Sequence, residues 1–150
     1  MPEIVTKTKP AATNAAALRT VQLPPIGEAW PGEGGVFAGL LKGEDGDYAV
    51  IVPLDPAADI AAAPWKDAIA AAGKFRTAQH DDYSAATRGE LALCFHNVPE
   101  LFKKDWYWSS TPSAGYASYA WYQDFYYGGQ GYGPKDYKLR ARAVRRLPIQ

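Results

Sequence analysis

The chain has 150 residues, close to the usual size of one domain, and 47% of them are apolar and 21% charged, which excludes extensive disorder. Sixteen basic and sixteen acidic residues cancel, so the chain has no net attraction to nucleic acid or to an anionic membrane surface. One cysteine, Cys94, cannot form an internal disulfide, which excludes a disulfide-rich secreted scaffold. No apolar run approaches the roughly eighteen residues of a membrane span, so we expect no membrane insertion.

The first 25 residues are rich in Ala, Thr, Pro and Lys and show little periodicity. This composition predicts a flexible tail over residues 1–25, and an arm that makes a homo-oligomer is the alternative. The opening residues lack the apolar stretch of a signal peptide, so we expect the protein in the cytoplasm or in a virion. Residues 26–150 are expected to form a single folded domain.

The first element of that domain is a predicted β-hairpin. Apolar runs at 36–41 and 48–52 flank a segment that contains Asp45 and Gly46, the pattern of two antiparallel strands joined by a tight turn. Pro53 ends the second strand, because proline donates no hydrogen bond to a neighbouring strand.

Two helices follow the hairpin. The first is predicted over residues 65–72, with Gly73 in the position directly after the helix. The second is better marked, because Thr87 and Glu90 have the spacing of a capping box. Pro99 limits the length of this second helix.

The aromatic residues are concentrated in one segment: twelve of the twenty lie between Trp106 and Tyr137. This segment is rich in Tyr, Ser and Gly, and it is broken by Pro and Gly into runs that predict several short strands. A last strand is expected over residues 137–147. Two helices among many short strands, without a βαβ rhythm, indicate an α+β fold.

Six basic residues and one acidic residue lie between positions 135 and 146, beside the aromatic segment. Stacking aromatics next to positive charge are typical of single-strand nucleic-acid binding. Between Trp106 and Pro134, however, the aromatic segment carries no positive charge, so we expect no nucleic-acid partner. We expect the terminal arginines to pair instead with carboxylates such as Asp81, Asp82, Glu90 and Glu100.

Nothing in the sequence indicates an enzyme. Cys94 and His96 are two residues apart on the second helix and therefore point to different faces, which favours a packed cysteine and a surface histidine. His80 has carboxylates beside it, but no partners at metal-ligand spacing occur elsewhere, so we expect a polar loop. No catalytic residue, metal or cofactor is expected.

The aromatic segment is better explained as a binding surface. Alternation over residues 121–127 places one set of side chains on one face and the rest on the other. The first set is Trp121, Gln123, Phe125 and Tyr127, and the second is Tyr122, Asp124 and Tyr126. Ten tyrosines cannot all lie in the core of a chain this size. A surface of Tyr, Ser and Gly is typical of protein-binding paratopes, where rigid rings supply contact area at low entropic cost.

The same segment carries a family resemblance. The runs Trp106–Thr111, Ala120–Phe125 and Arg140–Leu147 together form a pattern that resembles the C-type-lectin-fold variable proteins of diversity-generating retroelements and related bacterial and prophage domains. The resemblance covers about residues 27–147. It implies a C-type-lectin-like fold of two helices, several short antiparallel strands and long loops. Residues 26–150 would be the ligand-binding domain, with a variable region at about 106–147.

In such families a reverse transcriptase copies a template repeat and misreads adenines, so that selected codons vary on a fixed scaffold. The resemblance therefore implies a non-enzymatic protein that displays a diversified surface to a macromolecule, most simply a protein. A phage or prophage tail adhesin of fixed specificity is the alternative. The chain lacks the Glu-Pro-Asn, Gln-Pro-Asp and Trp-Asn-Asp runs of calcium-dependent lectins.

Carried over to this sequence, the resemblance divides the segment into scaffold and contact positions. The expected scaffold positions are Trp108, Ser109, Ser110, Trp121, Phe125, Lys135, Arg140, Arg142 and Arg145. The expected variable contact positions are Ser113, Gly115, Tyr116, Ser118, Tyr119, Tyr122, Asp124, Tyr126, Tyr127, Gly131, Tyr132, Gly133, Tyr137 and Leu139.

Overall fold

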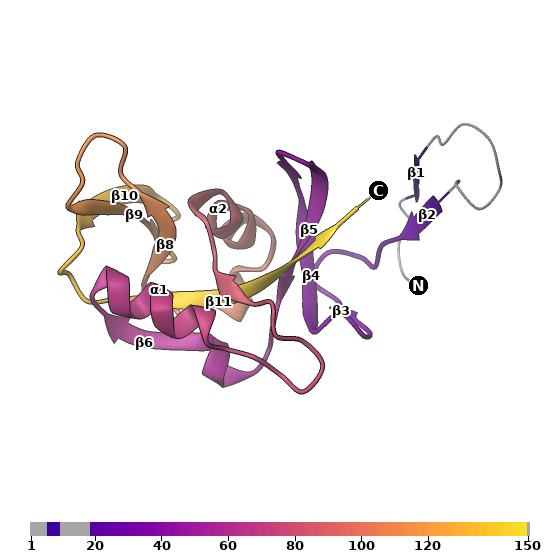
Figure 1. Ribbon diagram of the computed structural model, residues 1–150, viewed down its shortest axis with the longest axis horizontal. Helices are drawn as coiled ribbons and strands as arrows, with labels where there is room; N and C mark the ends of the chain where they lie inside the picture. Colours follow the sequence, from indigo (N-terminus) through magenta and orange to yellow (C-terminus); the bar gives the residue numbers. More distant parts are fainter. Residues whose placement is uncertain (1–5, 10–18, 150) are drawn as a thin grey trace.

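A computed structural model describes residues 6–9 and 19–149 (Figure 1). The helices are α1 (Trp65–Gly73), α2 (Arg88–Asn97) and the short 3-10 helices η2 (Pro56–Ala58) and η3 (Pro99–Leu101). The strands are β1 (Thr6–Lys9), β2 (Arg19–Gln22), β3 (Ala29–Trp30), β4 (Gly35–Gly43), β5 (Gly46–Val52), β6 (Asp59–Ala63), β7 (Ser84–Ala85), β8 (Trp106–Pro112), β9 (Tyr119–Asp124), β10 (Gln130–Pro134) and β11 (Leu139–Pro148). A mixed α+β fold with two α-helices in the described part of the chain is therefore confirmed.

Strand β11 joins the two ends of the molecule. The main sheet has the strand order β10-β9-β8-β11-β5-β4-β3, and β6 and β7 also pair with β11. All of these pairings are antiparallel except that of β11 with β8, where Arg140 lies opposite Tyr107. Figure 1 shows β11 running from the aromatic strands β8–β10 to the hairpin β4–β5. The aromatic strands thus form one end of the fold.

The predicted hairpin is present as β4 and β5, closed by a two-residue turn between Gly43 and Gly46. The register shifts between Phe37 and Gly39, where Gly39 has a φ of +136°. A Cβ at Gly39 would lie 2.9 Å from the amide nitrogen of Asn97, which donates to the carbonyl of Ala38. Glycine at this bulge therefore lets α2 approach the hairpin.

Both predicted helices form. Thr87 caps α2 through both bonds of a capping box, since its hydroxyl accepts from the Glu90 amide and its own amide donates to the Glu90 carboxylate. The expected position of Gly73 after α1 is wrong by one residue. Gly73 is the last residue of the helix, and Lys74 follows in right-handed helical geometry with its amide bonded to Ala71 and Ala72. No left-handed residue is needed there.

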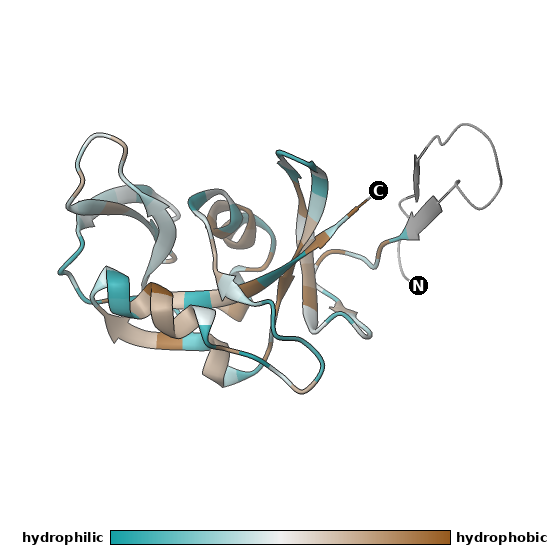
Figure 2. Ribbon diagram, viewed as in Figure 1, coloured by the Kyte–Doolittle hydropathy of each residue, from teal (hydrophilic) through white to brown (hydrophobic). Residues whose placement is uncertain are grey.

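The buried apolar residues form three clusters. The first lies under α2, which packs between β8–β9 and the hairpin, and includes Leu91, Cys94 and Phe125. The second lies under α1 and includes Trp108. The third lies on β4, β5 and the end of the chain. In Figure 2 the hairpin and α2 are the browner parts, whereas β8–β10 are pale because Tyr, Trp, Gly and Ser have intermediate hydropathy.

Much of the predicted segment 1–25 lies outside the described residues. Within it, β1 and β2 pair as a separate two-stranded antiparallel sheet, in which Thr6 lies opposite Gln22. Leu23 is only 2% exposed and packs in the third cluster with Phe37 and Ile51. The packed core therefore includes a residue from the segment that was expected to be a tail or an arm.

Candidate functional site

The pairing of β8, β9 and β10 sorts the aromatic side chains onto two sides of the sheet. Trp121 lies opposite Tyr132, and Tyr122 lies opposite both Trp108 and Gly131. Because side chains alternate along a strand, Trp121 and Tyr132 share one side and Tyr122 the other. The expected alternation of Trp121 and Tyr122 is thus seen in the pairing.

On the side facing α2, four aromatic rings form what we call the tyrosine cluster: Tyr116, Tyr119, Trp121 and Tyr132. The Tyr132 ring is at the centre, 5.0 Å from Trp121, 5.9 Å from Tyr116 and 6.0 Å from Tyr119 between ring centroids. Tyr116 also contacts Tyr119 at 5.4 Å. Tyr116 and Tyr132 are 57% and 45% exposed. The rings of the cluster thus contact one another and are still partly exposed to solvent.

The inner side of the cluster is fixed by α2. The Arg88 guanidinium lies 3.4 Å from the centroid of the Trp121 ring, an arrangement that contributes about 0.5–2 kcal/mol in proteins. Gln130 holds Arg88 from β10, since its side chain accepts from Arg88 Nε and donates to the Arg88 carbonyl. Gln130 also donates to the buried Gln123 side chain at 2.9 Å. These hydrogen bonds connect β10 to α2 and to β9 beneath the rings of the tyrosine cluster.

On the opposite side of the sheet, the half-buried Tyr122 ring packs between two tryptophans. It stacks on Trp106 at 4.8 Å with an interplanar angle of 10° and meets Trp108 edge-on at 6.5 Å. A Cβ at Gly131 would lie 2.8 Å from the Tyr122 hydroxyl oxygen, so glycine there makes room for the ring. Tyr122 is therefore a packing residue on this side of the sheet. Trp106, which is 39% exposed, shields the Tyr122 ring from solvent.

The alternation expected to continue to Tyr127 is wrong beyond Asp124, because β9 ends there. Tyr126 and Tyr127 instead lie in the turn between β9 and β10 and are 60% and 90% exposed. Their turn is fixed by Asp124, whose carboxylate accepts from the Tyr126 amide at 2.7 Å. Gly128 has a φ of +90°, and a Cβ there would collide with the Phe95 ring. The two tyrosines are thus displayed by a turn that only glycine closes without strain.

The expected contact positions divide by exposure. Gly133 is buried, although it lies on the edge strand β10, where it pairs with Ala120 of β9. The half-buried positions are Ser113, Tyr119, Tyr122, Asp124, Gly131 and Leu139. The exposed positions are Gly115, Tyr116, Ser118, Tyr126, Tyr127, Tyr132 and Tyr137.

The structure adds two residues that the sequence did not single out, Trp106 and Arg88. Trp106 shares the parity of Trp108 along β8, a signal that could have placed it beside Tyr122. Arg88 has no such signal, because its contact with Trp121 depends on how α2 docks. Of the expected scaffold, Trp108 is fully buried.

The terminal arginines are neutralised mostly by carboxylates. Arg145 pairs with Asp82 at 2.7 Å and Arg146 with Glu90 at 2.7 Å, as predicted. The expected partners Asp81 and Glu100 do not occur among the ion pairs of the described residues. In their place, Asp59 pairs with Arg140 and Glu33 with Arg145. Both are distant in sequence from the arginines they meet.

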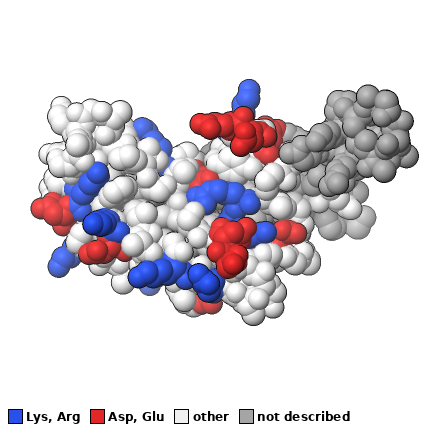
Figure 3. Space-filling view, in the orientation of Figure 1, with Lys and Arg blue, Asp and Glu red and all other residues white. Residues whose placement is uncertain are grey.

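The aromatic end of the molecule carries little charge. Figure 3 shows most of the upper surface of this end, over β9 and β10, in white, the colour of residues other than Lys, Arg, Asp and Glu. Between β8 and β10 the only charged residue is Asp124, whose carboxylate is used in its own turn. The groups that this face exposes are therefore mainly aromatic rings, hydroxyls and backbone groups.

The residues considered for catalysis are placed apart from this face. Cys94 is fully buried, and burial raises the pKa of its thiol to about 12, whereas His96 is exposed. The packed cysteine and surface histidine are thus confirmed. Across residues 6–9 and 19–149, no group of three or more His, Cys, Asp and Glu side chains is arranged to hold a metal ion. No helix in that part of the chain is long and apolar enough to cross a bilayer.

No known protein family matches the chain, and no curated protein matches it significantly. Any functional conclusion therefore depends on the residues and their geometry.

Proposed function

We propose that this chain is a non-enzymatic binding protein whose tyrosine cluster and exposed β9–β10 turn contact a protein ligand. The observation that carries the proposal is the interlocked set of open rings around Tyr132, held from behind by Arg88 and Gln130. Exposed aromatic rings that are already fixed lose little conformational entropy on binding.

The amount and kind of exposed surface support a protein ligand. One large aromatic side chain buries about 150–250 Å² when fully covered, and a typical interface buries about 800 Å² on each partner. Tyr116, Tyr126, Tyr127 and Tyr132 together therefore account for a large share of such an interface. Tyrosine is also enriched among the residues that dominate interface energies.

The family resemblance extends the proposal to a C-type-lectin-like scaffold with diversified contact positions. Its support in the structure is a mixed α+β fold whose aromatic strands lie together at one end. The positions able to vary without disturbing packing are the exposed ones, whereas Gly131 makes room for the Tyr122 ring and Gly133 is buried. Diversification would thus act on the exposed rings of the tyrosine cluster and on the exposed positions in the turns between strands.

The binding proposal is tested by removing two exposed rings. Once a ligand is identified by screening the immobilised chain against purified proteins, its affinity is measured by calorimetry for the double variant Tyr116→Ala, Tyr132→Ala. We expect affinity to fall by at least about thirtyfold, since hot-spot residues each contribute about 2 kcal/mol or more. The melting temperature should change little, because neither ring belongs to the three buried clusters of the core.

The matched control is Ile26→Ala, which removes a 52% exposed apolar side chain outside the aromatic segment. It should leave the affinity unchanged. A double tyrosine variant that binds as tightly as the unaltered chain would contradict the proposed binding face.

A further inference from the structure

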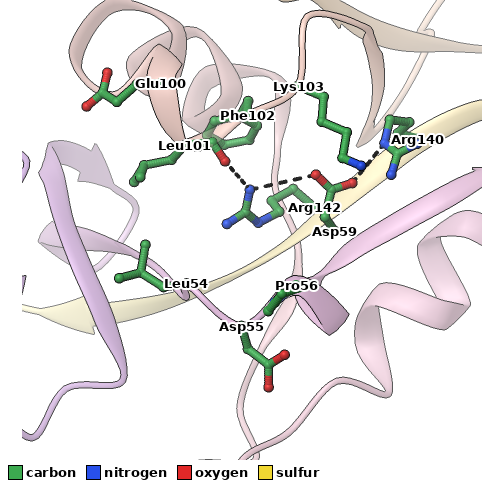
Figure 4. A pocket seen from close by; sticks show the side chains of 10 residues that line it. All are labelled: Leu54, Asp55, Pro56, Asp59, Glu100, Leu101, Phe102, Lys103, Arg140 and Arg142. Atoms are coloured by element: carbon green, nitrogen blue, oxygen red, sulfur yellow. Dashed lines mark hydrogen bonds and ion pairs between the residues drawn. The ribbon is translucent and has the colours of Figure 1, made fainter.

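A cavity of about 300 Å³ lies between η2, η3 and β11, and none of the expected contact positions lines it (Figure 4). Leu54, Pro56, Leu101 and Phe102 form apolar parts of its wall. This volume is at the lower end of the range for ligand sites, so it suits a small molecule. The cavity is therefore independent of the aromatic face and of the function proposed for it.

The charged part of the wall is built around one carboxylate, that of Asp59. Arg140 Nε lies 2.8 Å from one carboxylate oxygen, and the Tyr107 hydroxyl donates to the other at 2.7 Å. Arg142 lies 4.0 Å from the same carboxylate. Figure 4 shows the Lys103 amino group directed toward Asp59 and Arg140. Three cations thus surround one anion.

The positive charge of Arg142 is less well neutralised by a carboxylate than that of Arg140. Its side chain is 5% exposed, and its two terminal nitrogens donate to the neutral carbonyls of Leu101 and Pro53 at 2.5 and 2.6 Å. Its Nε has no hydrogen-bond partner in the described part of the chain. A buried charge that lacks a close counterion is energetically costly. A further negative charge nearby would therefore stabilise this group.

The other acidic residues of the wall do not supply that charge. The Asp55 carboxylate accepts from the Ala57 amide at the start of η2. In Figure 4 the carboxylates of Asp55 and Glu100 point away from the guanidinium groups. The full lining holds three acidic and three basic residues, so the excess of positive charge is local: Lys103, Arg140 and Arg142 lie around the single carboxylate of Asp59 on the inner side of the wall.

We propose that this cavity binds a small organic dianion, of the class that includes phosphate monoesters and short dicarboxylates. Lys103 and Arg140 would contact the anion at the rim, and Arg142 acts as a fixed charge beneath them. The apolar wall accepts the short hydrocarbon part of such a ligand. The negative charges of the ligand would lie against these three cations and away from Asp55 and Glu100.

The test is an NMR titration of the full chain with inorganic phosphate and, separately, with succinate. Both are used at about pH 8, where a phosphate carries nearly two charges, and sodium chloride keeps the ionic strength constant. We expect saturable shifts in the signals of Leu101, Lys103 and the Arg140 side chain, with a Kd of roughly 1 mM or below. Binding of phosphate alone or of succinate alone supports the site and identifies the type of dianion.

Two neighbouring lysines supply matched variants. Lys103→Ala should weaken binding about tenfold, the effect of losing one charge-assisted contact. Lys104→Ala removes an equally exposed lysine that does not line the cavity, so binding should be unchanged. Saturation with neither dianion, or equal weakening by both variants, would overturn the proposal.

Discussion

Glu90 shows how much of the fold depends on single buried polar residues. Its carboxylate, 1% exposed, accepts from the Thr87 amide, the Tyr48 hydroxyl and the Arg146 guanidinium. Burial alone would raise its pKa, but the bonds from Arg146, Thr87 and Tyr48 hold the pKa of this carboxyl below its usual value. One side chain thus joins the start of α2 to β5 and β11.

The lowered pKa makes a stability prediction with a definite sign. A carboxylate whose pKa is lowered by folding stabilises the native state at neutral pH, and this contribution is lost as the pH falls through the folded-state pKa. Glu90→Gln should therefore reduce the free energy of unfolding by about 2–4 kcal/mol at neutral pH. The variant should also lose less stability than the unaltered chain on acidification. Urea unfolding at several pH values measures both effects, and parallel pH profiles would contradict the assignment.

At the scale of elements, the turn between β9 and β10 determines how the exposed tyrosines are presented. Gly128 combines a left-handed backbone with the Phe95 ring directly against its α-carbon. The amide of Gly128 bonds to the Asp124 carbonyl, and its own carbonyl accepts from the Gln123 side chain. Both backbone groups of Gly128 are therefore hydrogen-bonded, which fixes the turn.

Substitution at this turn should be costly. Gly128→Ala is expected to destabilise the protein by about 2 kcal/mol or more, because an L-residue is strained at this φ and its Cβ would displace Phe95. Gly115→Ala is the control, since Gly115 is exposed, has no positive φ and has open space around its α-carbon. Thermal unfolding compares the two. Equal stability of both variants would show that the turn rearranges freely.

At the scale of the whole molecule, local features were predictable and long-range ones were not. The hairpin and the capping box depend on residues near one another in sequence, so their patterns identify them. The pairing of Arg140 with Asp59 spans 81 residues, and nothing in either segment specifies the other. The stacking of Trp106 on Tyr122 likewise depends on the register between β8 and β9.

The candidate site follows the same division. Its composition marked the aromatic segment, and alternation separated Trp121 from Tyr122. Exposure, however, depends on which rings and which small residues lie beside each side chain in the assembled sheet. Tyr122 and Tyr132 are both strand tyrosines, yet one packs between tryptophans and the other is 45% exposed. Only the assembled sheet distinguishes them.

Sequencing the DNA that flanks the gene tests the proposed diversified face most directly. We expect a second copy of the codons for about residues 106–147, beside a reverse transcriptase gene, that differs from the gene chiefly where the copy has adenine. The differing codons should fall on exposed positions such as Tyr116 and Tyr132 and spare Trp108 and Gly133. Flanking DNA without such a copy, or differences that fall on the buried positions, would contradict a diversified face.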